Sequence, residues 1–305
     1  MSKRRPRPKL YSPRMWGSWT AVGVGWMAAR LPLRWLLGIG RGIGIAAFHL
    51  AGHRRRITDI NLALCFPALS AAERRSLARE AFVHAGVSLT EMLMVWLNPG
   101  RDVTGRFTVS GVEHLQQAQA AGRGVVLLAG HFSCLDIVSQ PVAQATDIDV
   151  IYRENKNPVF EWLQVRGRRR FFDGVIERDD TRQILRRLKA GRTIWYAADQ
   201  DYGPRHSVFA PFFGVPAASI TATARLARFN QSPVVLMTQY RDLETLTWEV
   251  AFHPALEDFP GDDDVADAAR INAVIEAAVR RHPEQYLWAH RRFKTRPAGE
   301  PSFYR

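Results

Sequence analysis

The stretch "GVVLLAGHFSCLD", from Gly124 to Asp136, decides the fold class of this 305-residue chain. It begins with a run of apolar residues, Val125 to Ala129, a pattern typical of a strand that is buried on both faces of a parallel sheet. His131 follows the predicted strand, and Asp136 comes five positions later. We expect a helix to begin just after the histidine. The pair is open to three interpretations: a base with the carboxylate that orients it, two metal ligands, or two unrelated polar residues.

Strand and helix patterns alternate from about residue 105 onwards. A capping-box sequence, Ser70 with Glu73, opens a long helix that should end near Leu97, before "NPG". Downstream, apolar strand patterns cover 148–153, 193–201, 233–242 and 247–256, and amphipathic helix patterns cover 158–170, 181–190, 217–229 and 267–283. This alternation predicts an α/β fold with a mixed, largely parallel sheet flanked by helices.

The composition narrows the possible settings and partners. Hydrophobic residues make up 47% of the chain, which excludes a disordered protein. The formal charge of +13 fits three kinds of partner: nucleic acid, an anionic membrane surface, and an acidic protein or phosphorylated substrate. The two cysteines, Cys65 and Cys134, are too few for a disulfide framework or a four-cysteine zinc site. A reducing, cytoplasmic setting is the simplest interpretation.

The N-terminal segment favours the membrane among these partners. A basic leader precedes two apolar stretches, Met15 to Ala29, which holds three tryptophans, and Trp35 to Ala51. Neither stretch reaches the roughly 20 clean apolar residues of a transmembrane helix. Because tryptophan and arginine suit a lipid headgroup region, we interpret residues 1–55 as a basic leader with a membrane-associated helical anchor, and residues 56–305 as the main domain. Two buried core helices are the alternative; a nucleic-acid-binding arm would carry less tryptophan and leucine.

Polar side chains gather where predicted strands end, which is where ligand sites form in open α/β sheets. Guanidinium groups bind phosphate through paired hydrogen bonds, so arginines near these ends are candidate substrate ligands. The two aspartates of "DQD" would bind a divalent metal, bind substrate hydroxyls or tie down a turn. The clusters are His131 with Asp136, Arg153 with Asn155, and Asp199 with Asp201, and Arg168 lies in the arginine-rich helix that follows Arg153.

A histidine and an aspartate at this spacing suit general base catalysis. The Asp136 carboxylate would accept the Nδ1 proton of His131, and Nε2 would then face a substrate hydroxyl. Since no serine or cysteine nucleophile is matched to His131, the substrate hydroxyl would attack an activated acyl carbon directly.

Several stretches together resemble one known family. They are "NLALCFPALS", "GRGVVLLAGHFSCLD", "YRENKNP", "AADQDYGPRHSVFAPFFGVPAAS" and "PEQYLWAHRRFKTRP". The chain resembles, from about Arg14 to Pro297, the secondary (late) acyltransferases of lipid A biosynthesis, the lauroyl/myristoyl transferase group of the lysophospholipid acyltransferase superfamily. The resemblance implies a glycerol-3-phosphate acyltransferase-like fold, with residues 56–305 as the acyltransferase domain.

The resemblance also implies a reaction: an acyl chain moves from acyl carrier protein to a hydroxyl of a 3-hydroxyacyl chain on a lipid A precursor. His131 would be the base and Asp136 its orienter, with no cofactor or metal required. The partners would be acyl carrier protein, the lipid A precursor and the cytoplasmic face of the inner membrane, and not nucleic acid. The alternatives are a superfamily acyltransferase acting on another membrane lipid, such as a glycolipid or ornithine lipid, and a non-catalytic basic protein. The substrate-binding candidates are Arg153, Asn155, Arg168, Asp199 and Asp201.

Overall fold

The computed structural model describes residues 10–304 and is built around one large sheet. Its strand order is β1-β9-β8-β2-β5-β3-β4. Strands β8, β2, β5, β3 and β4 run parallel, whereas β9 pairs antiparallel with β8 and parallel with β1. The predicted mixed, largely parallel sheet is therefore confirmed. The strands are β1 (Phe107–Ser110), β2 (Val125–Ala129), β3 (Ile148–Tyr152), β4 (Gly174–Glu177), β5 (Thr193–Ala197), β8 (Val234–Asp242) and β9 (Thr247–Ala255).

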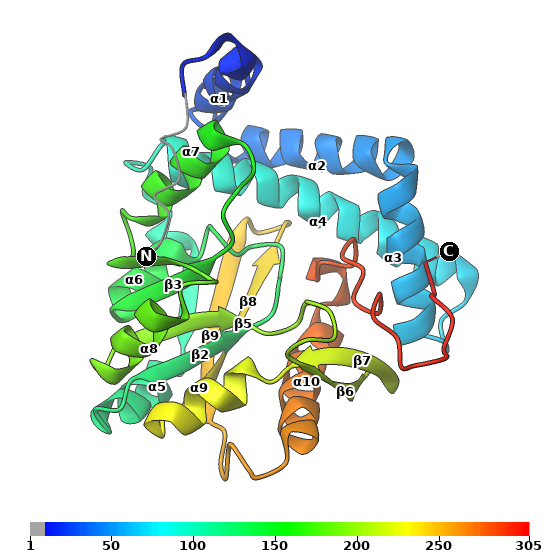
Figure 1. Cartoon of the computed structure of the whole chain (residues 1–305). Coiled ribbons are helices and arrows are strands. Elements are labelled where there is room, and N and C mark those ends of the chain that lie inside the picture. The colour runs from blue at the N-terminus through cyan, green and yellow to red at the C-terminus, as the bar shows by residue number, and fades with distance from the viewer. Residues whose placement is uncertain (1–9, 305) are drawn as a thin grey trace.

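Helices cover both faces of the sheet (Figure 1). Their buried apolar side chains form two clusters, one on each face. Leu127 of β2 belongs to one cluster and Leu128 to the other, because successive side chains of a strand point to opposite faces. One face carries α5 (Val112–Ala120), α6 (Ser139–Ala145) and α7 (Pro158–Arg168), and the other carries α8 (Thr181–Lys189), α9 (Ala222–Asn230) and α10 (Asp264–Arg281).

Four helices precede the sheet in the sequence: α1 (Trp16–Ala28), α2 (Leu33–Leu50), α3 (Gly52–Cys65) and α4 (Ala71–Leu97). The predicted capping box starts α4: Glu73 N donates to Ser70 Oγ (3.2 Å), and Ser70 N donates to Glu73 Oε2 (2.7 Å). The helix ends at the predicted residue. Helix α2 lies alongside α4 above the sheet in Figure 1. The boundary predicted at residue 55 falls inside α3, and residues 1–9 of the predicted basic leader lie outside the described part.

Within residues 10–304, no single helix is long and apolar enough to cross a bilayer. Helices α2 and α3 meet the criteria of length and composition only as a pair, and the chain bends by 89° between them.

The helix predicted over 217–229 is wrong in its first part. Residues Val215–Ile220 form β7, which pairs antiparallel with β6 (Ser207–Phe212), and α9 begins only at Ala222. Phe213 and Gly214, with φ angles of 53° and 75°, make the turn between the two strands. Pairing with β6 outweighs the helix propensity of the alanines in β7, because propensity is the weaker effect.

Candidate active site

His131 and Asp199 lie side by side at the carboxyl edge of the sheet. Strands β2 and β5 are parallel neighbours with Ala129 opposite Ala197, so the second residue beyond each strand reaches the same place. His131 Nδ1 lies 2.5 Å from Asp199 Oδ1, and His131 N donates to Asp199 Oδ2 at 2.8 Å. A single carboxylate therefore holds both the ring and the backbone of the histidine.

The surroundings of this pair suit a general base. The Asp199 side chain is 1% exposed, whereas the His131 side chain is 25% exposed and so accessible to a substrate. Burial raises the pKa of Asp199, but the adjacent His131 and hydrogen bonds from His131 and Tyr286 together lower it to about 2. Asp199 is thus a carboxylate near neutral pH. A carboxylate beside Nδ1 keeps a proton on that nitrogen and leaves Nε2 free to accept one.

A distant segment holds the backbone that carries His131. Leu287 N donates to His131 O at 3.1 Å, and Ser133 N donates to Gln285 O at 2.7 Å. These bonds attach the turn after β2 to the chain that follows α10. The position of His131 therefore depends on the segment that follows α10 as well as on β2.

A buried ion pair supports the same turn from the other side. Arg241, at the end of β8, pairs with Glu91 of α4, and both side chains are almost fully buried. The Nε–Oε1 distance is 2.6 Å, and Trp248 Nε1 donates to the same carboxylate at 2.8 Å. Arg241 also donates to the carbonyl and the hydroxyl of Ser133, each at 3.2 Å. The pair thereby connects α4, β8 and the turn that follows His131.

Asp136 does not accept from His131 as predicted. Its Oδ1 accepts a hydrogen bond from Arg168 Nε at 3.1 Å, and the carboxylate on His131 Nδ1 is that of Asp199. The cause lies in the local chain path: residues 133–138 form turns, and α6 begins only after them. The helix expected directly after the histidine is absent there, so helical spacing does not set the position of Asp136.

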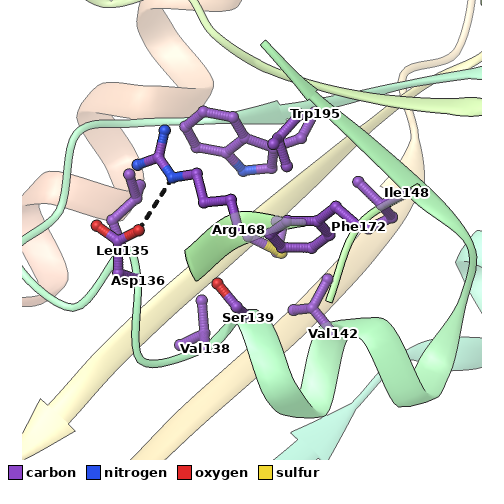
Figure 2. A pocket seen from close by; sticks show the side chains of 11 residues that line it. Leu135, Asp136, Val138, Ser139, Val142, Ile148, Arg168, Phe172 and Trp195 are labelled. Atoms are coloured by element: carbon purple, nitrogen blue, oxygen red, sulfur yellow. Dashed lines mark hydrogen bonds and ion pairs between the residues drawn. The ribbon is translucent and has the colours of Figure 1, made fainter. Parts of the chain in front are cut away.

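The Asp136–Arg168 ion pair lies beside an apolar pocket with about 390 Å³ of empty space, part of it open to solvent (Figure 2). The pocket is on the α6 and α7 face of the sheet. Its apolar lining includes Val138, Val142, Ile148, Phe172, Trp195 and Met237. A smaller pocket of about 220 Å³ lies beside His131 and Asp199 and includes Asn61, His290 and Arg292.

Other predicted substrate ligands are placed differently. Arg153 and Asn155 are exposed beyond the end of β3, and Asn155 N donates to Glu161 Oε2 at 2.7 Å. Asp201 is buried, and its carboxylate accepts from Gly203 N (2.8 Å), Thr295 N (2.7 Å) and Thr295 Oγ1 (2.9 Å). Of the alternatives for "DQD", tying down the chain describes these contacts of Asp201, and its contact with a substrate stays a prediction.

Neither cysteine is suited to act as a nucleophile. Cys65 and Cys134 are both buried and free. Burial raises the pKa of the Cys134 thiol to about 12, and it raises that of Cys65 further. Because the thiolate is the reactive form, both side chains are inert near neutral pH. The arrangement instead fits transfer to a hydroxyl that the substrate brings.

An accessible imidazole held by a buried carboxylate at the strand ends of an α/β sheet is suited to general base catalysis, and comparisons with known proteins give the family. Residues 4–295 match the family described as bacterial lipid A biosynthesis acyltransferase. The chain is 38% identical over 296 residues to the lipid A biosynthesis lauroyltransferase of Escherichia coli (strain K12), covering 97% of each chain. It is 39% identical over 293 residues to the lipid A biosynthesis palmitoleoyltransferase of the same organism, covering 96% of this chain and 95% of that one.

Among solved structures, a more distant likeness is the 1-acyl-sn-glycerophosphate acyltransferase from Thermotoga maritima. Its TM-score is 0.38 at 16% identity, over 82% of this chain and 97% of that chain. The sequence matches are decisive by themselves, since they extend over nearly the whole length. The chain belongs to the bacterial lipid A biosynthesis acyltransferase family.

Proposed function

We propose that this protein moves an acyl chain from acyl carrier protein to a hydroxyl of a 3-hydroxyacyl chain on a lipid A precursor. The observation that carries the proposal is the His131–Asp199 pair, in which a buried carboxylate holds an accessible imidazole at 2.5 Å. Family membership supports a lipid A precursor as the acceptor, and the charge of +13 suits an acidic carrier protein as the donor.

In the proposed reaction His131 Nε2 takes the proton of the acceptor hydroxyl while that oxygen attacks the thioester carbon. The new carbon–oxygen bond forms, the carbon–sulfur bond breaks, and His131 returns the proton to the departing thiolate. Asp199 stabilises the imidazolium that exists between the two proton transfers. Asp136 acts indirectly, because its carboxylate holds Arg168 at the edge of the apolar pocket.

Arg153 is proposed to contact a phosphate of the acceptor. It is exposed beyond β3. Its charge lowers the pKa of Tyr202 and the charge of Asp199 raises it, so Arg153 and Asp199 both act on this tyrosine. Replacing Arg153 with alanine should raise the KM for the acceptor and leave the KM for the donor unchanged. An unaltered acceptor KM would exclude this contact.

We further propose that α1 and α2 rest on the cytoplasmic face of the inner membrane. Large apolar side chains are exposed along both helices, and Arg30 stacks over the Trp26 ring at 3.4 Å. Tryptophan and arginine suit the headgroup region, and an acceptor lipid would be reached there. The exposed set is Trp16, Val24, Trp26, Met27, Leu31, Trp35, Ile39 and Ile43. Flotation with phosphatidylglycerol vesicles should decrease when Trp26 and Trp35 are replaced by glutamate, and unchanged flotation would refute the placement.

The main test is transfer by purified protein in detergent. Acyl carrier protein carrying an acyl chain is the donor, a tetra- or penta-acylated lipid A precursor is the acceptor, and mass spectrometry follows the product. We expect the acceptor to gain the mass of one acyl group with the wild-type protein and not with His131→Ala. No gain with any lipid A precursor, or gain only with a glycolipid or ornithine lipid, would overturn the proposed acceptor.

A further inference from the structure

We propose that Arg241 is a positioning residue for His131: it holds the turn that carries the imidazole and thereby fixes the direction of Nε2. Glu91 and Gln285 in turn hold Arg241 in place. The inference depends on the proposed acyl transfer, in which His131 is the base, and adds to it residues that lie behind the base. It predicts that losing this support lowers kcat without weakening the binding of either substrate.

The turn that carries His131 needs support from other parts of the chain. Strand β2 ends at Ala129, and residues 133–138 belong to no strand or helix. Asp199 binds the ring and the backbone N–H of His131. The residues that follow His131 depend on contacts with distant segments, because neither the hydrogen bonds of the sheet nor those of α6 extend to them.

Arg241 reaches this turn from the end of β8. Its Nη1 donates to the hydroxyl of Ser133 and its Nη2 donates to the carbonyl of Ser133, each at 3.2 Å. Because Ser133 is two residues after His131, the guanidinium binds the chain just beyond the base. A planar guanidinium can bind this turn and a carboxylate at the same time, since its N–H donors point in several fixed directions, which a lysine ammonium does not reproduce.

Two side chains of α4 fix the guanidinium on its other side. Arg241 donates from Nε to Glu91 Oε1 at 2.6 Å, from Nη2 to Glu91 Oε2, and from Nη1 to His84 Nδ1 at 3.0 Å. The side chains of Arg241 and Glu91 are 0% and 1% exposed. Apolar residues of similar volume often replace a buried ion pair without loss of stability, so stability by itself does not account for this pair. Its contacts with the turn after His131 do.

Gln285 joins Arg241 to the segment on the other edge of the turn. Arg241 N donates to Gln285 Oε1, and Gln285 Nε2 donates to Arg241 O, both at 2.8 Å. The backbone carbonyl of Gln285 accepts from Ser133 N at 2.7 Å. The N–H, the carbonyl and the hydroxyl of Ser133 are therefore all bound by Gln285 and Arg241, and this fixes the chain two residues beyond the base.

The experiment measures kcat and KM of a double variant in the transfer assay, with thermal unfolding to give the folded fraction. Glu91→Gln with Arg241→Met removes both charges, keeps a carbonyl that can accept from Trp248 Nε1, and leaves Ser133 without the guanidinium. We expect kcat to fall at least about tenfold, since a displacement of about 1 Å at the reacting groups can cost about 10² in rate. The KM values for donor and acceptor should stay within about twofold of the wild type, because substrate contacts are unchanged.

The matched control makes the same exchanges in a second buried ion pair. Asp149 is fully buried in β3, and Arg187 donates to its carboxylate from Nε at 2.5 Å and from Nη2 at 2.8 Å. Asp149 is the second residue of β3, so this pair lies towards the amino end of the strand, whereas His131 lies at the carboxyl edge of the sheet. Asp149→Asn with Arg187→Met should leave kcat of the folded protein unchanged. An equal kcat loss in this control would overturn the positioning role.

A single variant, Gln285→Met, decides the matter if the Glu91 and Arg241 double variant does not fold. It leaves the ion pair intact and removes only the side-chain bonds to the Arg241 backbone. We again expect a lower kcat with both KM values unchanged. Wild-type kcat in the folded Gln285→Met protein, or in the folded double variant, would overturn the inference while the proposed function stands. If the wild type transfers no acyl chain from any carrier protein, the proposed function itself fails.

Discussion

At the scale of single residues, the contact between His131 and Asp199 follows from the register of strands β2 and β5. His131 and Asp199 are 68 positions apart in the sequence but each lies two residues beyond a paired alanine. The sequence contains a signal of this kind, since "AGH" and "AAD" end two neighbouring apolar strands. The signal can be used only when β2 and β5 are known to be neighbours, and the sequence order does not provide that information.

The first prediction compares the two aspartates near the base. Asp199→Asn should lower kcat by about 10²–10⁴, because a neutral amide neither fixes the tautomer of His131 nor stabilises its charged form. Asp136→Asn should cost less, since Asp136 contacts Arg168 and not the imidazole. Steady-state kinetics with both substrates will measure the two effects. A larger kcat loss in Asp136→Asn than in Asp199→Asn would restore Asp136 as the orienting residue.

At the scale of elements, glycines bring α2 and α4 into close contact. A Cβ on Gly44 would lie 2.3 Å from the carbonyl oxygen of Phe82 and 2.6 Å from the Cα of Val83, both in the backbone of α4. A Cβ on Gly86 of α4 would likewise lie 2.3 Å from the carbonyl oxygen of Gly40. Helix α2, which we propose to rest on the membrane, is therefore fitted directly against α4, whose Glu91 pairs with Arg241 near His131.

The second prediction compares Gly44, which makes this close contact, with Gly42, which lies two residues earlier on the same helix and has no close neighbour. Gly44→Ala should lower the free energy of unfolding by about 1–3 kcal/mol, because the backbones must separate to admit the methyl group. Gly42→Ala should raise it by about 0.5–1 kcal/mol, since nothing lies within 4 Å of the added Cβ and alanine favours the helix. Urea unfolding will measure both, and equal effects of the two substitutions would disprove the close contact.

At the scale of the whole molecule, the buried His84 and the half-buried His290 make the free energy of unfolding depend on pH. Burial, together with the neighbouring Arg241, lowers the pKa of His84 to about 3, and burial lowers that of His290 to about 4. In the unfolded chain both histidines titrate near pH 6.5. Between these values the unfolded state binds protons that the folded state does not, so acidification favours unfolding.

The third prediction is that acidification destabilises the folded protein. As the pH falls from about 6.5 to 4, the free energy of unfolding should decrease by up to about 1.4 kcal/mol per pH unit for each of the two histidines. Asp199 adds no loss in this range, because its lowered pKa makes its stabilising effect disappear only as the pH falls from about 4 towards 2. Urea unfolding at several pH values will give the slope. His290→Gln should make the slope shallower, and an unchanged slope would rule out His290 as a source.

Local patterns in the sequence determined much of this protein. The apolar run of β2, the capping box of α4 and the alternation of strands and helices predicted the α/β sheet, because each depends on neighbours in the chain. The strand-end position singled out His131, and the distributed motifs indicated the family. Local reasoning was wrong for residues 217–220, where an alanine-rich segment pairs as a strand, and for the helix expected directly after His131.

Only the tertiary structure decided which groups meet. Asp199 replaces Asp136 on the imidazole because strand order is a non-local property, set by packing across the whole sheet. Asp201, two residues further on, turns inward, where its carboxylate accepts hydrogen bonds from the backbone N–H and the hydroxyl of Thr295. The apolar pocket likewise exists only where α6, β3, β5 and β8 converge. Sequence periodicity fixes which face of an element is apolar, but the packing of separate elements fixes the shape of the space between them.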